Sequence, residues 1–397
     1  MTKTLARLFC SCVMLAASVA SAGGEIKVLT QNQYLGADLA PLFGATDNDA
    51  FNAALVGVLQ QVAANRFPER ALRQAKEIAD RRPDILALQE VWRFACVDAV
   101  QPPMHGAGCG DPSIAGAFVD HLQVTLDALQ ALGITYHAAA SVRNFDLAPL
   151  APPGFPGFPF LVNGVPAFLL ALDRDVILAR DGVATAKVDF TGFDPMICVL
   201  PSEDGCNYVT AAPAGTPLGP VPILRGFVGV DATVNGVDYR VVNTHLENRD
   251  LVPGDPRARF FQSAQAFELL QALAVTTPAE RRLVVLGDMN SAPEDAVVQT
   301  PLGDIVPPYL QFAGAGFTDA WTRRPGKVSG VTCCQAANLA NHKSALYERI
   351  DLIWSRETPA KVKQARVVGA DVSDKTPPAG QGIWPSDHGG VVAELQF

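Results

Sequence analysis

Short apolar runs recur along the chain, and most of them end in polar residues. Each run has the length and the β-branched content that are typical of a strand. The runs occupy residues 26–34, 83–91, 175–180, 237–247, 281–290, 348–355 and 388–397. Asn235-Gly236 lies between two apolar runs, and this dipeptide is a strong hairpin signal. We therefore expect antiparallel strand pairs, which disfavours a purely parallel sheet.

Helical periodicity lies between the predicted strands. Pro68 sits at a plausible first turn, and the helical pattern over residues 69–82 stops at Pro83, which cannot continue a helix. Residues 113–132 and 257–275 also carry apolar positions at helical spacing. We expect a helix over each of these three segments.

The N-terminus has the three parts of a secretory signal peptide in the right order. Lys3 and Arg7 give a basic start, an apolar stretch follows, and Ala20-Ser21-Ala22 is a small-residue cleavage site. We expect cleavage after Ala22 and a secreted or periplasmic protein. No later run of about 18 apolar residues without charges occurs, so we expect no transmembrane segment.

Cysteine spacing fits an exported protein. Of the eight cysteines, two lie in the predicted signal peptide, and six remain: Cys96, Cys109, Cys198, Cys206, Cys333 and Cys334. An even number in an exported chain favours disulfides over zinc, and no C-x-x-C pair occurs. We predict that the first two and the next two form disulfides. The adjacent last two are an awkward but feasible third pair.

Some segments interrupt the strand pattern with irregular sequence. Loop insertions are expected near residues 94–112, 148–166 and 193–222. The second is rich in Pro, Gly and Phe, and the third is rich in Pro and Gly. Strands resume on either side, so these segments are predicted to be long loops rather than linkers between domains.

The formal net charge is −9, and no run of Lys and Arg occurs. A protein that binds nucleic acid through non-specific contacts with the phosphate backbone is usually basic. The charge therefore argues against a stable nucleic-acid partner. It says less about an enzyme that works through a bound metal ion.

Polar residues that could bind a metal or transfer a proton lie at the ends of five predicted strands or beside them. They are Asn32, Glu90, His245, Asp288 with Asn290, and Asp387 with His388. Residues two apart in a strand share a face, so Asp288 and Asn290 should point the same way. Asp351 lies inside an apolar run, where a histidine N–H is a natural partner for a buried carboxylate. The other histidines are expected to be ordinary surface or core groups: His105, His121, His137 and His342.

This set of side chains suggests metal-assisted phosphoryl chemistry. Hard oxygen ligands suit Mg²⁺, Mn²⁺ or Ca²⁺ rather than zinc, and the candidates are Asn32, Glu90 and Asp387. Such a metal can polarise a phosphoryl oxygen. Asp288 can orient and deprotonate an attacking water, while His245 and His388 can donate hydrogen bonds to the phosphoryl oxygens.

Several sequence blocks occur in a fixed order from Asn32 to His388: TQNQYLG, LALQEVW, VVNTHLE, VVLGDMNSAP, ERIDLIW and PSDHGGVVAEL. In this order they resemble the endonuclease/exonuclease/phosphatase superfamily, which includes DNase I-like nucleases, neutral sphingomyelinases and inositol-polyphosphate 5-phosphatases. G-D-x-N followed by S-D-H is a specific combination. The blocks cover nearly the whole mature chain, so we expect a single domain over residues 23–397.

The resemblance implies a fold of class α+β. This fold is a four-layer α/β/β/α sandwich of two packed mixed β-sheets, with the active site at one end. By the same resemblance, Asn32 and Glu90 match the metal site, and Asp387 matches a further metal or water ligand. The implied cofactor is Mg²⁺, with Mn²⁺ or Ca²⁺ as alternatives.

The resemblance also implies roles for the catalytic residues. Asp288 matches the carboxylate that activates water, and Asn290 matches its positioning partner. His245 matches a histidine that contacts phosphate and can act as an acid. His388 matches a donor to the transition state, oriented by Asp351. The branch that cleaves abasic sites usually has no histidine at the position of His245, so that branch is disfavoured.

Two substrate classes compete within this interpretation. The first is a nuclease-like phosphodiester, and the second is a phospholipid or sphingomyelin, with phosphomonoesters also open. Residues 155–161 could touch a lipid surface, or could form a loop packed on its own Phe side chains. A non-catalytic binding module on the same fold is the competing function, but every expected catalytic position is filled. We expect a monomer.

Overall fold

The computed structural model describes residues 24–99, 107–211, 213–217, 219–249, 257–301, 303–378 and 382–397. The predicted signal peptide and His105 lie outside these residues. Within them, no helix has both the length and the apolar character needed to cross a lipid bilayer.

The first large sheet joins both ends of the described chain. Its strand order is β19-β20-β1-β2-β6-β3, and β4 and β5 also pair with β6. The strands are β1 (Glu25–Asn32), β2 (Ile85–Gln89), β3 (Arg93–Asp98), β4 (Tyr136–Asp146), β5 (Phe158–Val162), β6 (Val165–Arg180), β19 (Lys361–Val368) and β20 (Gly390–Gln396). β1 and β2 run parallel, and the other pairs are antiparallel.

The second large sheet comes from the middle of the chain. Its order is β17-β18-β14-β13-β12-β9-β8, with β7 paired to β12. The strands are β7 (Ala184–Lys187), β8 (Leu200–Ser202), β9 (Gly205–Asn207), β12 (Gly226–Val234), β13 (Val237–His245), β14 (Arg282–Asp288), β17 (Thr318–Asp319) and β18 (Asp351–Ser355). β13 and β14 are parallel, so each large sheet contains one parallel pair. Two small hairpins join β10 (Pro213–Thr216) to β11 (Gly219–Pro222) and β15 (Val298–Thr300) to β16 (Gly303–Ile305).

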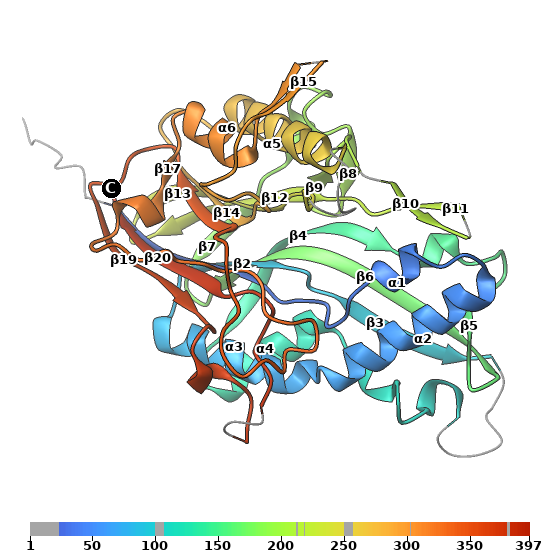
Figure 1. Cartoon of the computed structure of the whole chain (residues 1–397). Coiled ribbons are helices and arrows are strands. Elements are labelled where there is room, and N and C mark those ends of the chain that lie inside the picture. The colour runs from blue at the N-terminus through green and yellow to red at the C-terminus, as the bar shows by residue number, and fades with distance from the viewer. Residues whose placement is uncertain are drawn as a thin grey trace, which may run out of the picture.

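The two large sheets pack face to face between two layers of helices (Figure 1). The helices are α1 (Ala40–Phe43), α2 (Asn48–Ala64), α3 (Phe67–Arg81), α4 (His121–Ala131), α5 (Arg257–Thr276) and α6 (Pro308–Gly314). Val28 and Leu286 belong to the apolar core between the sheets. Leu269 and Phe312 join α5 and α6 to the second sheet, and Leu129 belongs to the layer that joins α3 and α4 to the first. This arrangement confirms the predicted four-layer sandwich.

The predicted hairpin between β12 and β13 is present. These strands pair in antiparallel register up to Val234 and Val237. Asn235 and Gly236 form the turn with φ values of 51° and 78°. Both residues tolerate the left-handed region that this tight turn requires.

The helix predicted over residues 113–132 begins later than expected, at His121. The side chain of Asp120 accepts a hydrogen bond from the Leu122 backbone N–H and so caps the start of α4. The preceding segment forms only a short 3₁₀ turn at Ala115–Ala117. The sequence pattern had merged these two elements.

The sequence prediction did not include α2, although its signals are present. Asp47 caps the helix by accepting a hydrogen bond from the backbone N–H of Ala50. Its buried side chains recur at helical spacing: Leu55, Val58, Leu59 and Val62. The intervening Val56 and Gly57 obscure this stripe in the sequence.

The predicted loops at residues 148–166 and 193–222 both contain strands, so the expectation of wholly irregular structure was wrong. β5 folds back on the start of β6 across Asn163-Gly164. Those residues have φ values of 50° and 79°, a turn signal that the Pro- and Phe-rich composition obscured. In the second segment, β8 pairs with β9 and β10 pairs with β11.

Disulfides join Cys96 to Cys109, Cys198 to Cys206, and Cys333 to Cys334. The two predicted close pairs are therefore confirmed, and the adjacent pair is bonded as well.

Candidate active site

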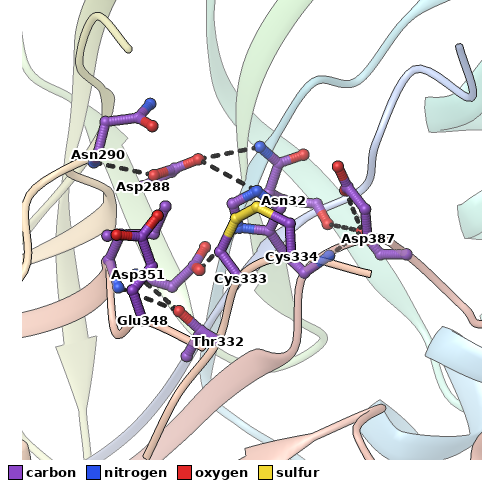
Figure 2. Close-up of a disulfide and its surroundings, with 12 residues drawn as sticks. Asn32, Asp288, Asn290, Thr332, Cys333, Cys334, Glu348, Asp351 and Asp387 are labelled. Atoms are coloured by element: carbon purple, nitrogen blue, oxygen red, sulfur yellow. Dashed lines mark hydrogen bonds and ion pairs between the residues drawn. A yellow bond between two sulfur atoms is a disulfide. The ribbon is translucent and has the colours of Figure 1, made fainter. Parts of the chain in front are cut away.

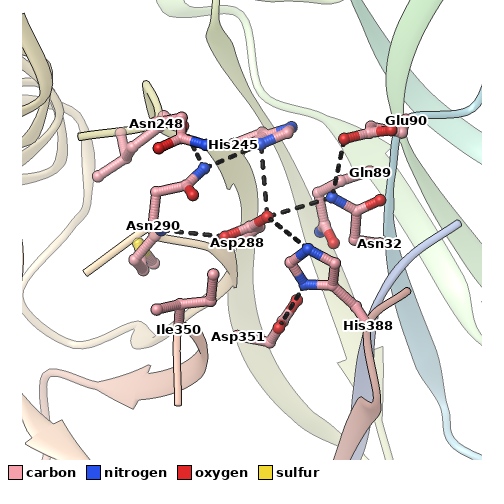
Figure 3. A network of polar contacts seen from close by, with 12 residues as sticks. Asn32, Gln89, Glu90, His245, Asn248, Asp288, Asn290, Ile350, Asp351 and His388 are labelled. Atoms are coloured by element: carbon pink, nitrogen blue, oxygen red, sulfur yellow. Dashed lines mark hydrogen bonds and ion pairs between the residues drawn. The ribbon is translucent and has the colours of Figure 1, made fainter. Parts of the chain in front are cut away.

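The two parallel strand pairs end at the same edge of the sandwich. Asn32 is the last residue of β1, and Glu90 directly follows β2. His245 and Asp288 are the last residues of β13 and β14, and the register places them side by side. Carboxyl ends of parallel strands point in one direction, so four predicted site residues meet where the sheets face each other (Figure 3).

Two further residues reach this edge from antiparallel strands. Asp351 begins β18 and lies opposite Asp288 in the register. His388 lies two residues before β20, the strand that pairs with β1. The site therefore combines the two sheets with the last strand of the chain.

Asp288 lies at the centre of the site and is buried. Its Oδ2 accepts a hydrogen bond from Asn32 Nδ2 at 3.1 Å. The same oxygen lies 3.4 Å from His245 Nε2 and 3.8 Å from His388 Nε2 (Figure 3). Burial raises the pKa of Asp288 to about 7, although His388 opposes the shift.

Asn290 reaches the site by a turn rather than by the strand pleat. β14 ends at Asp288, and Asn290 has a φ of 46°, in the left-handed region that asparagine tolerates. Asp288 Oδ1 accepts a hydrogen bond from the Asn290 backbone N–H at 3.0 Å, which closes the turn. The expectation that both side chains share a strand face was therefore wrong. Asn290 Nδ2 instead donates to the carbonyl oxygen of Leu246 at 2.9 Å and lies 3.2 Å from His245 Nε2.

The glycine of the G-D-x-N block has a steric role. A Cβ at Gly287 would overlap the carbonyl oxygen of Thr244 on the neighbouring strand. Glycine therefore allows β14 to approach β13 closely at the point where the site residues emerge.

His388 is held by Asp351 and is surrounded by negative charge. The imidazole Nδ1 lies 2.8 Å from Asp351 Oδ2. Burial opposes protonation, but Asp351, Asp288 and Asp387 outweigh it and raise the pKa of His388 well above its ordinary value. The raised pKa favours the protonated form of His388, in which Nδ1 donates to Asp351 and Nε2 is directed towards Asp288.

His245 has the opposite electrostatic environment. Burial, Arg225 and His388 all lower its pKa well below the ordinary value. Arg225 Nη1 lies 2.9 Å from His245 Nδ1, and since a guanidinium can only donate, Nδ1 accepts. The remaining proton is on Nε2, which faces Asp288. The sequence interpretation gave His245 a phosphate-contacting role in which it can act as an acid, but its lowered pKa disfavours the protonated form, whereas the pKa of His388 is raised.

Sequence reasoning missed Arg225 and Glu247. Arg225 lies directly before β12 and is half-buried, and its Nε lies 3.7 Å from Glu247 Oε1. Glu247 is buried two residues after His245. The available signal was a lone arginine at the start of an apolar strand, which is weak without the fold.

The other two predicted metal ligands, Glu90 and Asp387, lie near Asn32 on the side away from Asp288. Glu90 Oε1 accepts a hydrogen bond from Asn32 Nδ2 at 3.1 Å, and Glu90 Oε2 accepts from the Leu35 N–H at 2.8 Å. Burial, opposed by His388, raises the pKa of Asp387 to about 6, and Glu90 adds to the increase. A divalent cation would offset this concentration of negative charge. The carboxylate oxygens of Glu90 and Asp387 therefore fit a hard metal ion. Asn32 turns its Nδ2 towards Glu90, and its Oδ1 accepts a hydrogen bond from the Tyr34 N–H.

Two other groups of side chains also have metal-ligand spacing. Asp288, Asp351 and His388 form one group, and His388 with Cys333 and Cys334 forms the other. A metal in the first group would displace the His388–Asp351 hydrogen bond. The sulfur atoms of the second are joined to each other and offer no thiolate. Glu90 and Asp387 with Asn32 remain the better candidates.

The Cys333–Cys334 disulfide borders the site (Figure 2). Cys333 forms a β-bridge with His388. Next to it, Thr332 Oγ1 accepts hydrogen bonds from the N–H groups of Ile350 and Asp351 at 3.1 and 3.2 Å. The loop around the disulfide thus connects the two segments that carry Asp351 and His388.

Comparison with solved structures finds several proteins that are similar to this chain over most of its length. An endonuclease/exonuclease/phosphatase family protein from Leptotrichia buccalis C-1013-b has 15% identity and a TM-score of 0.47, with 94% of this chain and 100% of that chain covered. An endonuclease/exonuclease/phosphatase from Beutenbergia cavernae DSM 12333 has 20% identity and a TM-score of 0.47, with 94% and 72% covered. D. rerio TDP2, solved with a single strand DNA product, has 13% identity and a TM-score of 0.45, with 94% and 99% covered.

Among curated proteins, no match to the chain is found. The family model described as "Endonuclease/Exonuclease/phosphatase family" matches residues 45–388. That span is most of the chain and contains seven of the eight predicted site residues, with Asn32 before it. On this match, the chain belongs to the endonuclease/exonuclease/phosphatase family.

Proposed function

We propose that this protein is a secreted, divalent-metal-dependent phosphodiesterase in which Asp288 activates the attacking water. The observation that carries the proposal is the position of Asp288. Its carboxylate is buried between Asn32, His245 and His388, and burial raises its pKa to about 7. A general base works best when its pKa is close to the working pH.

Asp288 uses its two oxygens differently. Oδ1 is held by the Asn290 N–H, so the carboxylate has a fixed orientation. Oδ2 faces the cluster of donors and is the atom that takes a proton from water. The water oxygen forms a bond to phosphorus while the bond to the leaving oxygen breaks. The proton that Asp288 takes is balanced by the proton that the leaving oxygen gains from solvent, giving a phosphomonoester and an alcohol.

The metal ligands and histidines act on the negative charge of the phosphate. Asn32, Glu90 and Asp387 would hold Mg²⁺, or alternatively Mn²⁺ or Ca²⁺, which supplies polarisation of a phosphoryl oxygen when bound. His388 presents a cationic N–H on the same side as Asp288, and Asp351 fixes the direction of that N–H. Donors placed in advance where charge develops are a large source of rate enhancement.

The test is hydrolysis of bis-p-nitrophenyl phosphate by the mature protein with Mg²⁺ or Mn²⁺, with and without EDTA. We expect metal-dependent release of nitrophenol that EDTA abolishes and added metal restores. The absence of hydrolysis with both Mg²⁺ and Mn²⁺ would favour a non-catalytic module and overturn the proposal.

The proposal also concerns the form of the protein in the cell. We propose that residues 23–397 act as one monomeric catalytic domain after cleavage behind Ala22. The complete set of described cysteines in disulfides supports an oxidising compartment. N-terminal sequencing of the exported protein, together with light scattering, tests both points. A retained leader or a stable dimer would contradict them.

A further inference from the structure

A large apolar cavity lies next to the proposed active site. Its volume is about 350 Å³, within the range of small-molecule sites. Its walls come mainly from α1, α2 and the strands β3, β4 and β6, and they include Leu39, Phe43, Phe51, Leu55, Phe145 and Leu147. The apolar walls make this cavity unlike the polar edge where the phosphate would bind.

One end of the cavity consists of residues that also form or support the site. Glu90 lines the cavity and accepts a hydrogen bond from Asn32. Arg225 lines it as well and contacts His245. A phosphate held at Asp288 would therefore have one of its two ester substituents beside the opening of the cavity.

The apolar surface continues beyond this first cavity. A second cavity of about 660 Å³ shares Phe51, Leu55 and Phe158 with the first. It extends along β5 to Phe155 and Leu161, each 50% exposed. Together the two cavities form one groove, which we call the apolar groove, leading from the site to exposed apolar side chains at the surface.

The charge of the groove does not suit a polynucleotide. Among the described residues that line the first cavity, the acidic ones are Asp38, Glu90, Asp173 and Glu247. The basic one is Arg225, which is half-buried and lies 3.7 Å from Glu247. A nucleic-acid groove needs cations that follow the phosphate backbone. Transfer of an uncharged hydrocarbon chain from water to an apolar groove, in contrast, is favourable whatever the net charge of the protein.

We propose that the apolar groove binds the hydrocarbon chain of a lipid phosphodiester while the phosphate lies at Asp288. This inference rests on the proposed function, because it assigns a substrate class to the same site. It favours the phospholipid class over the nuclease-like class. Phe155 and Leu161 then lie where the hydrocarbon chain would leave a lipid surface and enter the apolar groove.

The test uses alkyl p-nitrophenyl phosphodiesters with methyl, butyl and octyl chains, each below its micelle-forming concentration. Burial of each methylene should raise kcat/KM about fourfold until the groove is filled, which gives at least ~10²-fold between methyl and octyl esters. Thymidine 5′-p-nitrophenyl phosphate is the nucleotide comparison. Equal rates along the alkyl series, or a clear preference for the thymidine ester, would overturn the inference.

A pair of Phe→Lys variants locates the effect. Phe51 lines both cavities from α2 and is half-buried, so F51K places a charge in the groove without touching the site. Phe267 is 60% exposed on α5, in the helix layer on the far side of the sandwich, so F267K is the matched control. F51K should lower kcat/KM for the octyl ester at least tenfold and leave the methyl ester unchanged, whereas F267K should change neither. An equal fall in kcat/KM for both esters in F51K, with the unfolding midpoint unchanged, would contradict binding of the hydrocarbon chain in the apolar groove.

Binding measurements separate this inference from the proposed hydrolysis. Methylphosphonate and octylphosphonate cannot be hydrolysed, and calorimetry with Mg²⁺ reports their affinities directly. Tighter binding of the octyl compound in the wild type but not in F51K, without turnover of any ester, would reject the hydrolysis and support the groove. Turnover of all esters without tighter octyl binding would reject the groove and retain the hydrolysis.

Discussion

Asp288 can be tested by the smallest possible change. Asp288→Asn removes the basic oxygen, while the remaining carbonyl can still accept the hydrogen bond from the Asn290 N–H. We expect kcat to fall by ~10²–10⁴, the usual contribution of a positioned base. Steady-state kinetics with Mg²⁺ measures the effect, and circular dichroism checks the fold. A near-wild-type kcat with an unchanged spectrum would mean that this edge of the sheets is not the active site.

His388 and Asp351 should differ in the size of their effects. His388→Ala removes a donor to the developing charge, and loss of one such donor typically lowers kcat by ~10²–10³ with less change in KM. Asp351→Asn should be milder, because its amide oxygen can still accept from His388 Nδ1 and only the charge is lost. Kinetics of both variants under one set of conditions makes the comparison. A larger loss in Asp351→Asn than in His388→Ala would contradict the orienting role of Asp351.

Glu90 is the proposed metal ligand that a single substitution tests most directly. Gln at this position keeps an oxygen for the N–H of Leu35, so the local turn should survive in Glu90→Gln. We expect weaker Mg²⁺ or Mn²⁺ binding, since one negative charge leaves a site built from hard ligands. Titration calorimetry measures the affinity. Unchanged binding in a folded variant would show that Glu90 is not a ligand.

At the level of strands and turns, the sequence predicted the components of the site because their positions follow from strand geometry. Asn32, His245 and Asp288 end strands, and parallel neighbours carry such residues to one edge. Asn290 was misplaced because an Asp side chain closing a turn on a backbone N–H competes with the pleat. Arg225 was missed because its partners His245 and Glu247 are distant in the sequence and meet only through strand pairing.

Outside the site, too, elements with a local sequence signal were predictable, and elements that depend on contacts in the folded chain were not. The β12–β13 hairpin was predictable because its Asn-Gly turn is a local signal. The start of α4 and the strand β5 were not, since a capping side chain and pairing with β6 decide them. The apolar groove depends on α2, which sequence analysis missed. The substrate-binding surface was therefore less predictable than the catalytic edge.

The β12–β13 hairpin also contains a cross-strand ion pair whose pH dependence can be predicted. Asp231 and Arg240 lie opposite each other, with Nε–Oδ1 and Nη2–Oδ2 distances of 2.8 and 2.9 Å. Burial alone would raise the pKa of Asp231, but hydrogen bonds from Arg240 and Arg281 outweigh it and lower the pKa below 3.8. The stabilisation is therefore present above the pKa of the unfolded chain and is lost as pH falls through the folded value.

Asp231→Asn should lower the free energy of unfolding by about 1 kcal/mol at pH 7, as expected for a partly exposed pair. The difference from wild type should shrink at pH 3, where the wild-type carboxylate begins to take up a proton. Urea unfolding at the two pH values measures this, and Asp304→Asn on exposed β16 is the control. An equal loss at both pH values would mean that the charge of Asp231 does not contribute.

At the scale of the whole molecule, the proposed catalytic residues and the apolar groove lie in different parts of the sandwich. The catalytic edge lies where the two sheets meet, so its geometry depends on both. The apolar groove lies mainly on the first sheet and the helices beside it. Apart from Glu90 and Arg225, which also contact site residues, the groove can therefore vary in sequence without disturbing Asp288 or His388.

The pairing of β20 with β1 joins two segments that are far apart in the sequence. β1 ends in Asn32, and His388 lies two residues before β20. On the proposed mechanism, neither segment forms the site without the other. A molecule in which β20 has separated from β1 should therefore lose the proposed activity even where the second sheet stays folded.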